Sequence, residues 1–188
     1  MSQTNTPPAR RLCLITGASA GLGESFARLY AARGWDLALT ARRGDRLRTL
    51  AAELEERTGA AVQVVEADLA DPAAPKRIVH EAQSGDRTVS ALVNNAGYGL
   101  SGSFTATAWD DQAKQLQVMI VALCELARLT APGMAAQGYG RILNVASVAG
   151  LLPGTRGDVL YGPLKSFVVK FSQALNLENR KTGVHVTA

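Results

Sequence analysis

The chain has 188 residues and a formal net charge of +4, with 47% hydrophobic and 19% charged residues. This length and composition predict one soluble domain with a core of its own. Lys and Arg are scattered and aromatic residues make up only 5%, which argues against a nucleic-acid binder. Cys13 and Cys124 are too few for a disulfide scaffold, and no Cys/His spacing suggests a metal site. We expect a cytoplasmic protein.

Residues 1–11 are polar, contain two adjacent prolines and lack the apolar centre of a signal peptide. We expect them to form a flexible N-terminal tail. Residues 12–188 contain no repeat, linker or low-complexity block, and are expected to form one domain that ends early, at its sixth strand. We expect no membrane-spanning segment, because no stretch approaches the roughly 20 apolar residues of a span.

Short apolar runs alternate with segments whose apolar residues recur every three to four positions, which predicts alternating strands and helices. Strands are expected at 12–15, 35–40, 61–65, 91–93, 142–147 and 184–187. Gly34 and Gly59 are expected to end the first two helices, and Asp71 with Pro72 to start the third. A long helix is expected at about 110–130, broken up by Pro132 and Gly133, and a last one from Tyr161 to about Asn179. The alternation predicts an α/β fold, a doubly wound parallel sheet between two layers of helices.

A glycine-rich turn, TGASAGLG at residues 16–23, lies directly between the first strand and the first helix. Gly17 permits a sharp turn, whereas Gly21 and Gly23 permit close approach of a phosphate and close packing of helix on strand. Free N–H groups at the start of the helix attract a pyrophosphate. The turn indicates a dinucleotide site; the alternative is an ordinary strand–loop–helix turn.

Arg42 and Arg43 follow the second strand, where dinucleotide folds contact the adenosine ribose. An acidic residue there suits a free 2′-hydroxyl group, whereas an arginine suits a 2′-phosphate. The chain has two arginines and no acid at this place, which favours NADP(H) over NAD(H). The alternative is a pair of solvated charges at the start of a helix.

Further polar residues follow the later strands. Asp68 comes after the third strand, residues 94–97 (NNAG) after the fourth, and Ser147 at the end of the fifth. In open parallel sheets, ligands bind outside the carboxyl ends of the strands. We therefore expect these residues to share one nucleotide site with the glycine-rich turn.

Tyr161 and Lys165 are four residues apart, so they lie on one face of the last helix. A positive charge beside a phenol favours its ionised form, which lets a Tyr exchange a proton closer to neutral pH. The hydroxyl of Ser147 could hold a carbonyl or alcohol oxygen beside it. On its own the pair favours an amphipathic helix with a half-buried Tyr and a solvated Lys; the nucleotide site next to it changes that interpretation.

In this order and spacing, the motifs strongly resemble those of the short-chain dehydrogenase/reductase family. The resemblance rests on TGxxxGxG at residues 16–23, on Asp68, on NNAG, and on Ser147 with the pair Tyr161 and Lys165, and it extends from the first strand to the last residue. It implies a Rossmann fold and an NAD(P)-dependent oxidoreductase. Hydride would pass between the nicotinamide and a carbonyl or secondary alcohol.

The family's functional residues carry over to the matching positions. Ser147 would orient the substrate oxygen, Tyr161 would be the general acid and base, and Lys165 would hold the nicotinamide ribose and assist Tyr161. Arg42 would meet the 2′-phosphate and Asp68 the adenine amino group. The other implied cofactor contacts are Gly17, Ser19, Gly21, Leu22 and Gly23 at the pyrophosphate, Leu69 beside the adenine, and Asn95, Ala96 and Gly97 at the adenosine ribose.

Met119 departs from the family pattern, which usually has an Asn at this place in the long helix to help hold a water of the proton relay. A thioether cannot donate a hydrogen bond and accepts one only weakly. We therefore expect lower turnover than is usual in the family, and a higher kcat on Met119→Asn. The alternative is that Met119 simply fills the core, as its place on the apolar stripe suggests.

The chain also ends early relative to the family pattern. The pattern continues past the sixth strand with a Pro-Gly loop near the nicotinamide, a mobile lid and a seventh strand, whereas this chain ends at Ala188. Two interpretations stay open. The chain is either a fragment of a longer product or a shortened member that binds cofactor without efficient catalysis.

The sequence therefore predicts an NADP-dependent oxidoreductase acting on a carbonyl or secondary alcohol. The alternative is a cofactor-binding or scaffolding member with a degenerate site. Residues expected near the pocket suggest a small apolar substrate: Tyr98, Leu100, Val148, Leu151, Leu152 and Pro153. By analogy with the family, where the long helix and the Tyr161 helix pair across subunits, we expect a homodimer or homotetramer.

Overall fold

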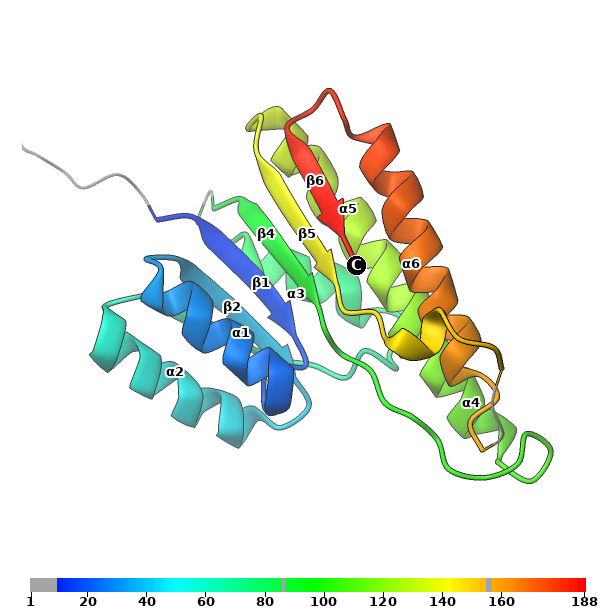
Figure 1. The fold of residues 1–188 in the computed structure, drawn as a ribbon. Helices are drawn as coiled ribbons and strands as arrows, with labels where there is room; N and C mark the ends of the chain where they lie inside the picture. Colours follow the sequence, from blue (N-terminus) through cyan, green and yellow to red (C-terminus); the bar gives the residue numbers. More distant parts are fainter. Residues whose placement is uncertain (1–9, 86, 155–156) are drawn as a thin grey trace, which may run out of the picture.

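The computed structural model describes residues 10–85, 87–154 and 157–188. The tail predicted for residues 1–11 lies outside the described residues, apart from Arg10 and Arg11. Within the described ranges, the chain forms one parallel sheet with helices on both faces (Figure 1). The predicted α/β architecture is confirmed.

The sheet has its strands in the order β3-β2-β1-β4-β5-β6, and all neighbouring strands run parallel. The strands are β1 (Leu12–Thr16), β2 (Asp36–Ala41), β3 (Val62–Glu66), β4 (Val89–Asn94), β5 (Gly140–Asn144) and β6 (Val184–Thr187). The order of the strands reverses between β1 and β4. At such a switch point, the connections leave the sheet in opposite directions and open a crevice at the carboxyl ends of the strands.

Helices flank the sheet on two sides. They are α1 (Gly21–Ala32), α2 (Gly44–Thr58), α3 (Ala74–Ala82), α4 (Trp109–Leu116), α5 (Ala122–Ala136) and α6 (Tyr161–Glu178), with a π-helical turn η1 (Gln117–Val121) and a 3₁₀ turn η2 (Val148–Gly150). In Figure 1, α1 and α2 lie in front of the β3–β2–β1 half, α3 and α5 lie behind the sheet, and α6 stands at the right beside β6. The buried side chains of α6 belong to the same core as those of α3 and α5. Among the described residues, no helix covers the near face of β5 and β6.

The residues of β1 show why two layers form. All five are buried, and successive side chains of a strand point to opposite faces. Leu12 and Leu14 pack with the core that includes α3 and α5, whereas Cys13 and Ile15 pack with the core beneath α1 and α2. A strand that is apolar on both faces needs a helical layer on each.

A chain of buried amides ties the ends of β4 and β5 to α6. Asn94 Nδ2 donates to Asn144 Oδ1 at 2.9 Å, and Asn144 Nδ2 donates to Ser172 Oγ at 2.9 Å. Asn144 is fully buried. Buried polar groups fix the elements that carry them, because a shift would leave a donor or acceptor unpaired. The chain of amides thus fixes α6, which begins with Tyr161, against the carboxyl end of β5.

Several element boundaries differ from the prediction by one to three residues, among them the end of β5 and the start of α3. β5 ends at Asn144, its last residue paired with β4, and Ser147 lies in the turn that follows. α3 begins at Ala74 rather than after Asp71, whose carboxylate instead accepts the N–H of Ala73 at 2.9 Å in a turn before the helix. In both places the sequence pattern, an apolar run or a capping residue, includes residues that do not take part in the backbone hydrogen bonds of the strand or helix.

The helix predicted at about 110–130 is longer, because α4, η1 and α5 follow one another without a gap from Trp109 to Ala136. Pro132, expected to break it, lies inside α5. Contrary to expectation, this helix contains an 18-residue window that is long and apolar enough to span a membrane by length and composition alone. Its buried side chains belong to the core against the sheet, and the core helix of a soluble protein meets the same criterion.

Replacing Asn144 by Ala is expected to lower the free energy of unfolding by about 2–4 kcal/mol, because it leaves the buried Asn94 and Ser172 side chains without this partner. Urea denaturation measures the loss. Asn179→Ala is the control: it removes an amide that donates to a backbone carbonyl at the partly exposed end of α6, and should cost about 0.5 kcal/mol. Equal losses in the two variants would contradict the role of the buried amides.

Candidate active site

The candidate site lies at the switch point between β1 and β4. Thr16 ends β1, and its Oγ1 accepts the backbone N–H groups of Asn95 and Ala96, both at 3.0 Å. The side-chain amide of Asn95 donates in return to the carbonyl oxygen of Thr16 at 3.0 Å. The turn after β4 is thereby fixed to the glycine-rich turn after β1.

The glycines of the first turn meet backbone requirements that other residues do not. Gly17 has a φ of +65°, and a Cβ there would lie 2.8 Å from Asn95 Nδ2. A Cβ on Gly23 would overlap the carbonyl oxygen of Gly17. Gly21 begins α1 with a φ of +58°. The N-cap residue Ala20 has no side-chain oxygen to accept the N–H groups of the first turn, so these groups can bind an anion.

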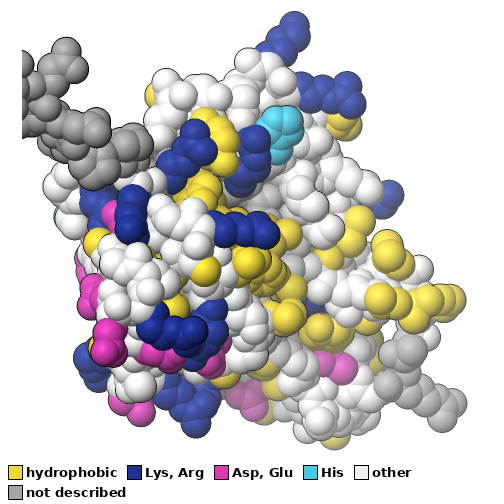
Figure 2. All heavy atoms as spheres, turned by 60° about the vertical axis from the view of Figure 1, so that its left-hand side comes forward, with side chains coloured by type: hydrophobic (Ala, Val, Ile, Leu, Met, Phe, Trp, Pro, Cys, Tyr) yellow, Lys and Arg dark blue, Asp and Glu magenta, His cyan; other side chains and the backbone are white. Residues whose placement is uncertain are grey.

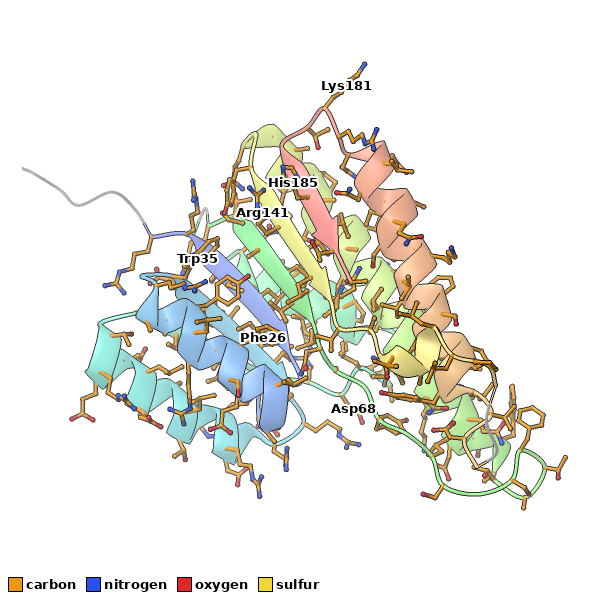
Figure 3. The ribbon with its side chains drawn as sticks, viewed as in Figure 1. Phe26, Trp35, Asp68, Arg141, Lys181 and His185 are labelled. Carbon is orange, nitrogen blue, oxygen red and sulfur yellow. The ribbon has the colours of Figure 1, made fainter. Side chains whose placement is uncertain are left out.

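A cavity of about 820 Å³ extends from the glycine-rich turn to the start of α6. Asp68, labelled in Figure 3, lies near the carboxyl ends of the strands on this side of the sheet. Gly21 and Gly23 do not line the cavity. They permit the backbone conformation and the close packing of the turn. The predicted residues that line the cavity are Gly17, Ser19, Leu22, Arg42, Asp68, Leu69, Asn95, Ala96, Gly97, Ser147, Tyr161 and Lys165.

Arg42 and Arg43 line the cavity where β2 passes into α2. The guanidinium of Arg43 donates through Nε and Nη2 to Ser19 Oγ, at 3.1 and 2.9 Å, and so lies beside the glycine-rich turn. Asp68 Oδ1 accepts the N–H of Ala70 at 3.0 Å, which orients this carboxylate in the turn after β3. Two neighbouring guanidinium groups can bind a doubly charged anion.

Ser147, Tyr161 and Lys165 line the same cavity near the start of α6. The ammonium of Lys165 lies 5.7 Å from the centre of the Tyr161 ring and donates to the carbonyl oxygen of Val145 at 2.6 Å. Lys165 is only 6% exposed, and burial lowers its pKa. Ser147 Oγ accepts the N–H of Ala149 at 3.2 Å, which leaves its hydroxyl hydrogen available to donate to a ligand.

Gly150 sets how closely the turn that carries Ser147 packs on α6. A Cβ at Gly150 would lie 2.6 Å from the carbonyl carbon of Lys165, so a larger residue would push η2 away from the helix. Ser166 Oγ adds a hydrogen bond to the carbonyl oxygen of Gly150 at 2.6 Å. These contacts hold Ser147 next to the helix that carries Tyr161.

Met119 lies in η1 and is 1% exposed. A Cβ on Gly97 would lie 3.5 Å from its Cε and Cγ atoms, so the thioether packs behind the NNAG turn. The preceding Val118 lines the cavity. Met119 therefore fills the core, and π-helical turns such as η1 are frequent at functional sites because they change which side chains face the ligand.

Several residues of the cavity were not predicted from the sequence. Lys114 and Val118 reach it from the long helix, and their spacing of four on one helix face was a usable signal. Arg43 was noted, but its bonds to Ser19 were not foreseen. The Val145 carbonyl that accepts from Lys165 is a backbone group, so no side-chain pattern could reveal it.

Comparison with known proteins places the chain in a family. The family model for short chain dehydrogenases matches residues 11–188. The chain is 37% identical over 179 residues to sulfoacetaldehyde reductase 2 of Chromohalobacter salexigens, covering 94% of this chain and 69% of that protein. Among solved structures, the short-chain dehydrogenase from Sphingobium yanoikuyae in complex with NADPH is 39% identical with a TM-score of 0.88, covering 95% of this chain and 69% of that one.

A second solved structure, the bulky-bulky ketone specific alcohol dehydrogenase from Comamonas testosteroni, is 36% identical with a TM-score of 0.86, covering 95% of this chain and 71% of that one. The chain therefore belongs to the short-chain dehydrogenase/reductase family, as its motifs predicted. Proteins of this family are NAD(P)-dependent oxidoreductases with a Rossmann fold.

Met119→Asn is expected to raise kcat, because an amide next to the NNAG turn can donate and accept hydrogen bonds that a thioether cannot. The same change should lower the free energy of unfolding by about 1–3 kcal/mol, since it places an amide in an apolar core. Steady-state kinetics and urea denaturation measure the two effects. Met119→Leu, which keeps the volume without a polar group, should leave kcat unchanged. An unchanged kcat in Met119→Asn would show that the proton follows another route.

Proposed function

We propose that this protein is an NADP(H)-dependent oxidoreductase that interconverts a carbonyl compound and a secondary alcohol, with Tyr161 as general acid and base. One observation carries the proposal. A single cavity contains Arg42 and Arg43 as well as the set Ser147, Tyr161 and Lys165. An anion site and an acid–base group in one cavity are what a phosphorylated dinucleotide and its substrate require.

The lining of the cavity suits a nicotinamide dinucleotide. The turn at Gly17 has no side chain, and the N–H groups of α1 that follow it suit a pyrophosphate. Arg42 and Arg43 suit a 2′-phosphate, and the Asp68 carboxylate suits the amino group of an adenine. The similar enzyme from Sphingobium yanoikuyae was solved with NADPH, which supports the same preference for this chain.

The cofactor supplies or accepts the hydride, and the side chains of the protein handle the substrate oxygen and its proton. The Ser147 hydroxyl donates a hydrogen bond to that oxygen. The Tyr161 phenol gives its proton to the oxygen in the direction of reduction and takes it back in the direction of oxidation. The ammonium of Lys165 lies 5.7 Å from the centre of the Tyr161 ring, where it can stabilise the negative charge that develops on the phenol oxygen during proton transfer.

We propose a small substrate with an apolar part. Val148 and Leu151 follow Ser147 and are 68% and 72% exposed. They line a second cavity of about 740 Å³, which shares Val145 and Ser147 with the first. Figure 2 shows other apolar side chains exposed at the surface next to Lys and Arg. An exposed apolar lining beside a catalytic hydroxyl favours apolar substituents on the carbonyl.

We further propose that residues 12–188 act as one NAD(P)-binding domain in a cytoplasmic homodimer or homotetramer. The last residue of η1, Val121, and Phe167 of α6 are 48% and 41% exposed, and Phe167 stacks on Phe171 with ring centres 5.7 Å apart. Apolar side chains on two long helices support pairing between subunits through these helices. Free rather than bridged cysteines support the cytoplasmic location.

Tyr161→Phe is expected to lower kcat by about 100-fold or more, because it removes only the phenol hydroxyl that transfers the proton. The dissociation constant for NADPH should stay within about twofold, since the ring remains in place. Fluorescence titration measures binding. The absorbance of the nicotinamide measures turnover with a panel of aliphatic and aromatic ketones plus sulfoacetaldehyde. Tyr139→Phe removes a hydroxyl at the opposite end of the strands and is the control.

The panel also separates the alternatives. Wild-type protein that binds NADPH but reduces no member of the panel would support the cofactor-binding or scaffolding alternative. If Tyr161→Phe keeps the turnover of the wild type, Tyr161 is not the general acid and base, but the proposed reaction is not contradicted. Absence of binding to NADPH and NADH would contradict both functions.

Replacing Arg42 and Arg43 together by Ala is expected to raise the dissociation constant for NADPH by about 100-fold, since each charge-assisted hydrogen bond contributes about 1.5–3 kcal/mol. The dissociation constant for NADH should change by about twofold at most, because NADH lacks the 2′-phosphate. Arg46→Ala removes an exposed guanidinium from the first turn of α2, outside the lining of the cavity, and is the control. Equal losses for NADPH and NADH would contradict recognition of the 2′-phosphate.

A further inference from the structure

The loop between β4 and α4 borders the candidate site, and glutamine side chains hold it to α4. The buried Gln112 donates through Nε2 to the carbonyl oxygen of Phe104 at 2.7 Å. The fully buried Gln115 donates through Nε2 to the carbonyl oxygen of Tyr98 at 3.0 Å. Tyr98 itself lines the cavity. The loop therefore has a defined position on the side of α4.

On its other side, the same loop is held by Asp158, three residues before Tyr161. Asp158 Oδ2 accepts the N–H of Leu100 at 2.7 Å, across 58 residues of sequence. Asp158 Oδ1 accepts the N–H of Tyr161 at 3.1 Å. The N–H of Gly102 donates to the carbonyl oxygen of Gly157 at 3.1 Å, which adds a second link between the same two segments.

The two oxygens of one carboxylate thus bind two different segments. One binds the loop after the NNAG turn and also accepts from Gln115 Nε2 of α4 at 3.5 Å. The other binds the first residue of α6, whose N-cap residue Leu160 has no side-chain acceptor. Backbone hydrogen bonds to an ionised carboxylate are stronger than those between neutral groups. A negative charge at the N-terminus of a helix is also favourable.

Resting on the proposed function, we propose that Asp158 is a positioning residue: its carboxylate fixes the backbone of Tyr161 relative to the loop at residues 97–102. The phenol of Tyr161 and the wall formed by that loop then keep one relative position while substrate enters. The close approach of Gly99, where a Cβ would lie 3.0 Å from Asp158 Oδ2, shows how tightly the loop lies on the carboxylate. If Asp158 only capped α6, the oxygen that accepts from Tyr161 would be sufficient. The second oxygen, which accepts from Leu100, links the loop to the helix.

Hydrogen exchange followed by mass spectrometry tests the link without any need for activity. In Asp158→Ala, amide exchange should be about tenfold faster or more, both at residues 97–102 and at residues 158–165, because both acceptors are lost. Asp71→Ala is the matched control. It removes a carboxylate that accepts a backbone N–H just before α3, and should leave both segments unchanged. Unchanged exchange at residues 97–102 in Asp158→Ala would overturn the proposal.

Asp158→Asn is the second variant, and it carries the test if Asp158→Ala does not fold. An amide has only one oxygen, so it can accept from Leu100 or from Tyr161 but not from both. Exchange should accelerate in one of the two segments and stay slow in the other. Slow exchange in both segments would overturn the proposal, because it would mean that the carboxylate does not link them.

Kinetics distinguish positioning from a general loss of folded protein. In Asp158→Ala, KM for the ketone should rise and kcat should fall, each by about tenfold, because small misplacements of reacting groups are costly. The dissociation constant for NADPH should stay within about twofold. The contrary result is a fall in kcat that matches the loss of NADPH binding sites, with KM unchanged. It would show that part of the protein is unfolded and would overturn the positioning role. If wild-type protein binds no NADPH, the proposed function fails, while the exchange experiment still decides whether Asp158 links the loop to Tyr161.

Discussion

The Thr16 hydroxyl joins the two turns that form the candidate site through two hydrogen bonds. Thr16 is 1% exposed, and its Oγ1 accepts two backbone N–H groups from the turn after β4. These bonds join two segments that lie about 80 residues apart in sequence but on neighbouring strands. A buried acceptor with two donors permits little movement. The part of the cavity lined by the glycine-rich turn and the NNAG turn therefore has a fixed shape before any ligand binds.

The cavity combines two electrostatic environments. The guanidinium groups of Arg42 and Arg43 are exposed, so binding a phosphate there removes little water from the cations. Lys165, in contrast, is buried, and burial lowers its pKa. A buried charge is screened less by water than an exposed one, so it acts more strongly on charge that develops nearby. In the proposed enzyme, the exposed charges provide affinity and the buried charge supports proton transfer.

Much of the fold could be predicted because single residues decide it locally. Gly34 and Gly59 have the positive φ values expected where helices end, and the residues of β1 are apolar on both faces. The position of Ser147 was predicted less well, since the end of β5 depends on pairing with β4 rather than on its own sequence. The bonds of Arg43 to Ser19 and of Asp158 to Leu100 join distant segments, and no local pattern marks them. Likewise, the spacing of apolar residues predicted the long helix but not the π-helical turn around Met119.

In the proposed reaction, this one cavity holds NADPH, and Tyr161 completes hydride transfer from it to a carbonyl. The most direct measurement uses NADPH deuterated at the transferable position of the nicotinamide, with mass spectrometry of the product alcohol. We expect the alcohol from wild-type protein to carry the deuterium at the former carbonyl carbon, and Tyr161→Phe to form almost none of it while still binding NADPH. Deuterium that stays on the bound nucleotide with every ketone of the panel would contradict the account.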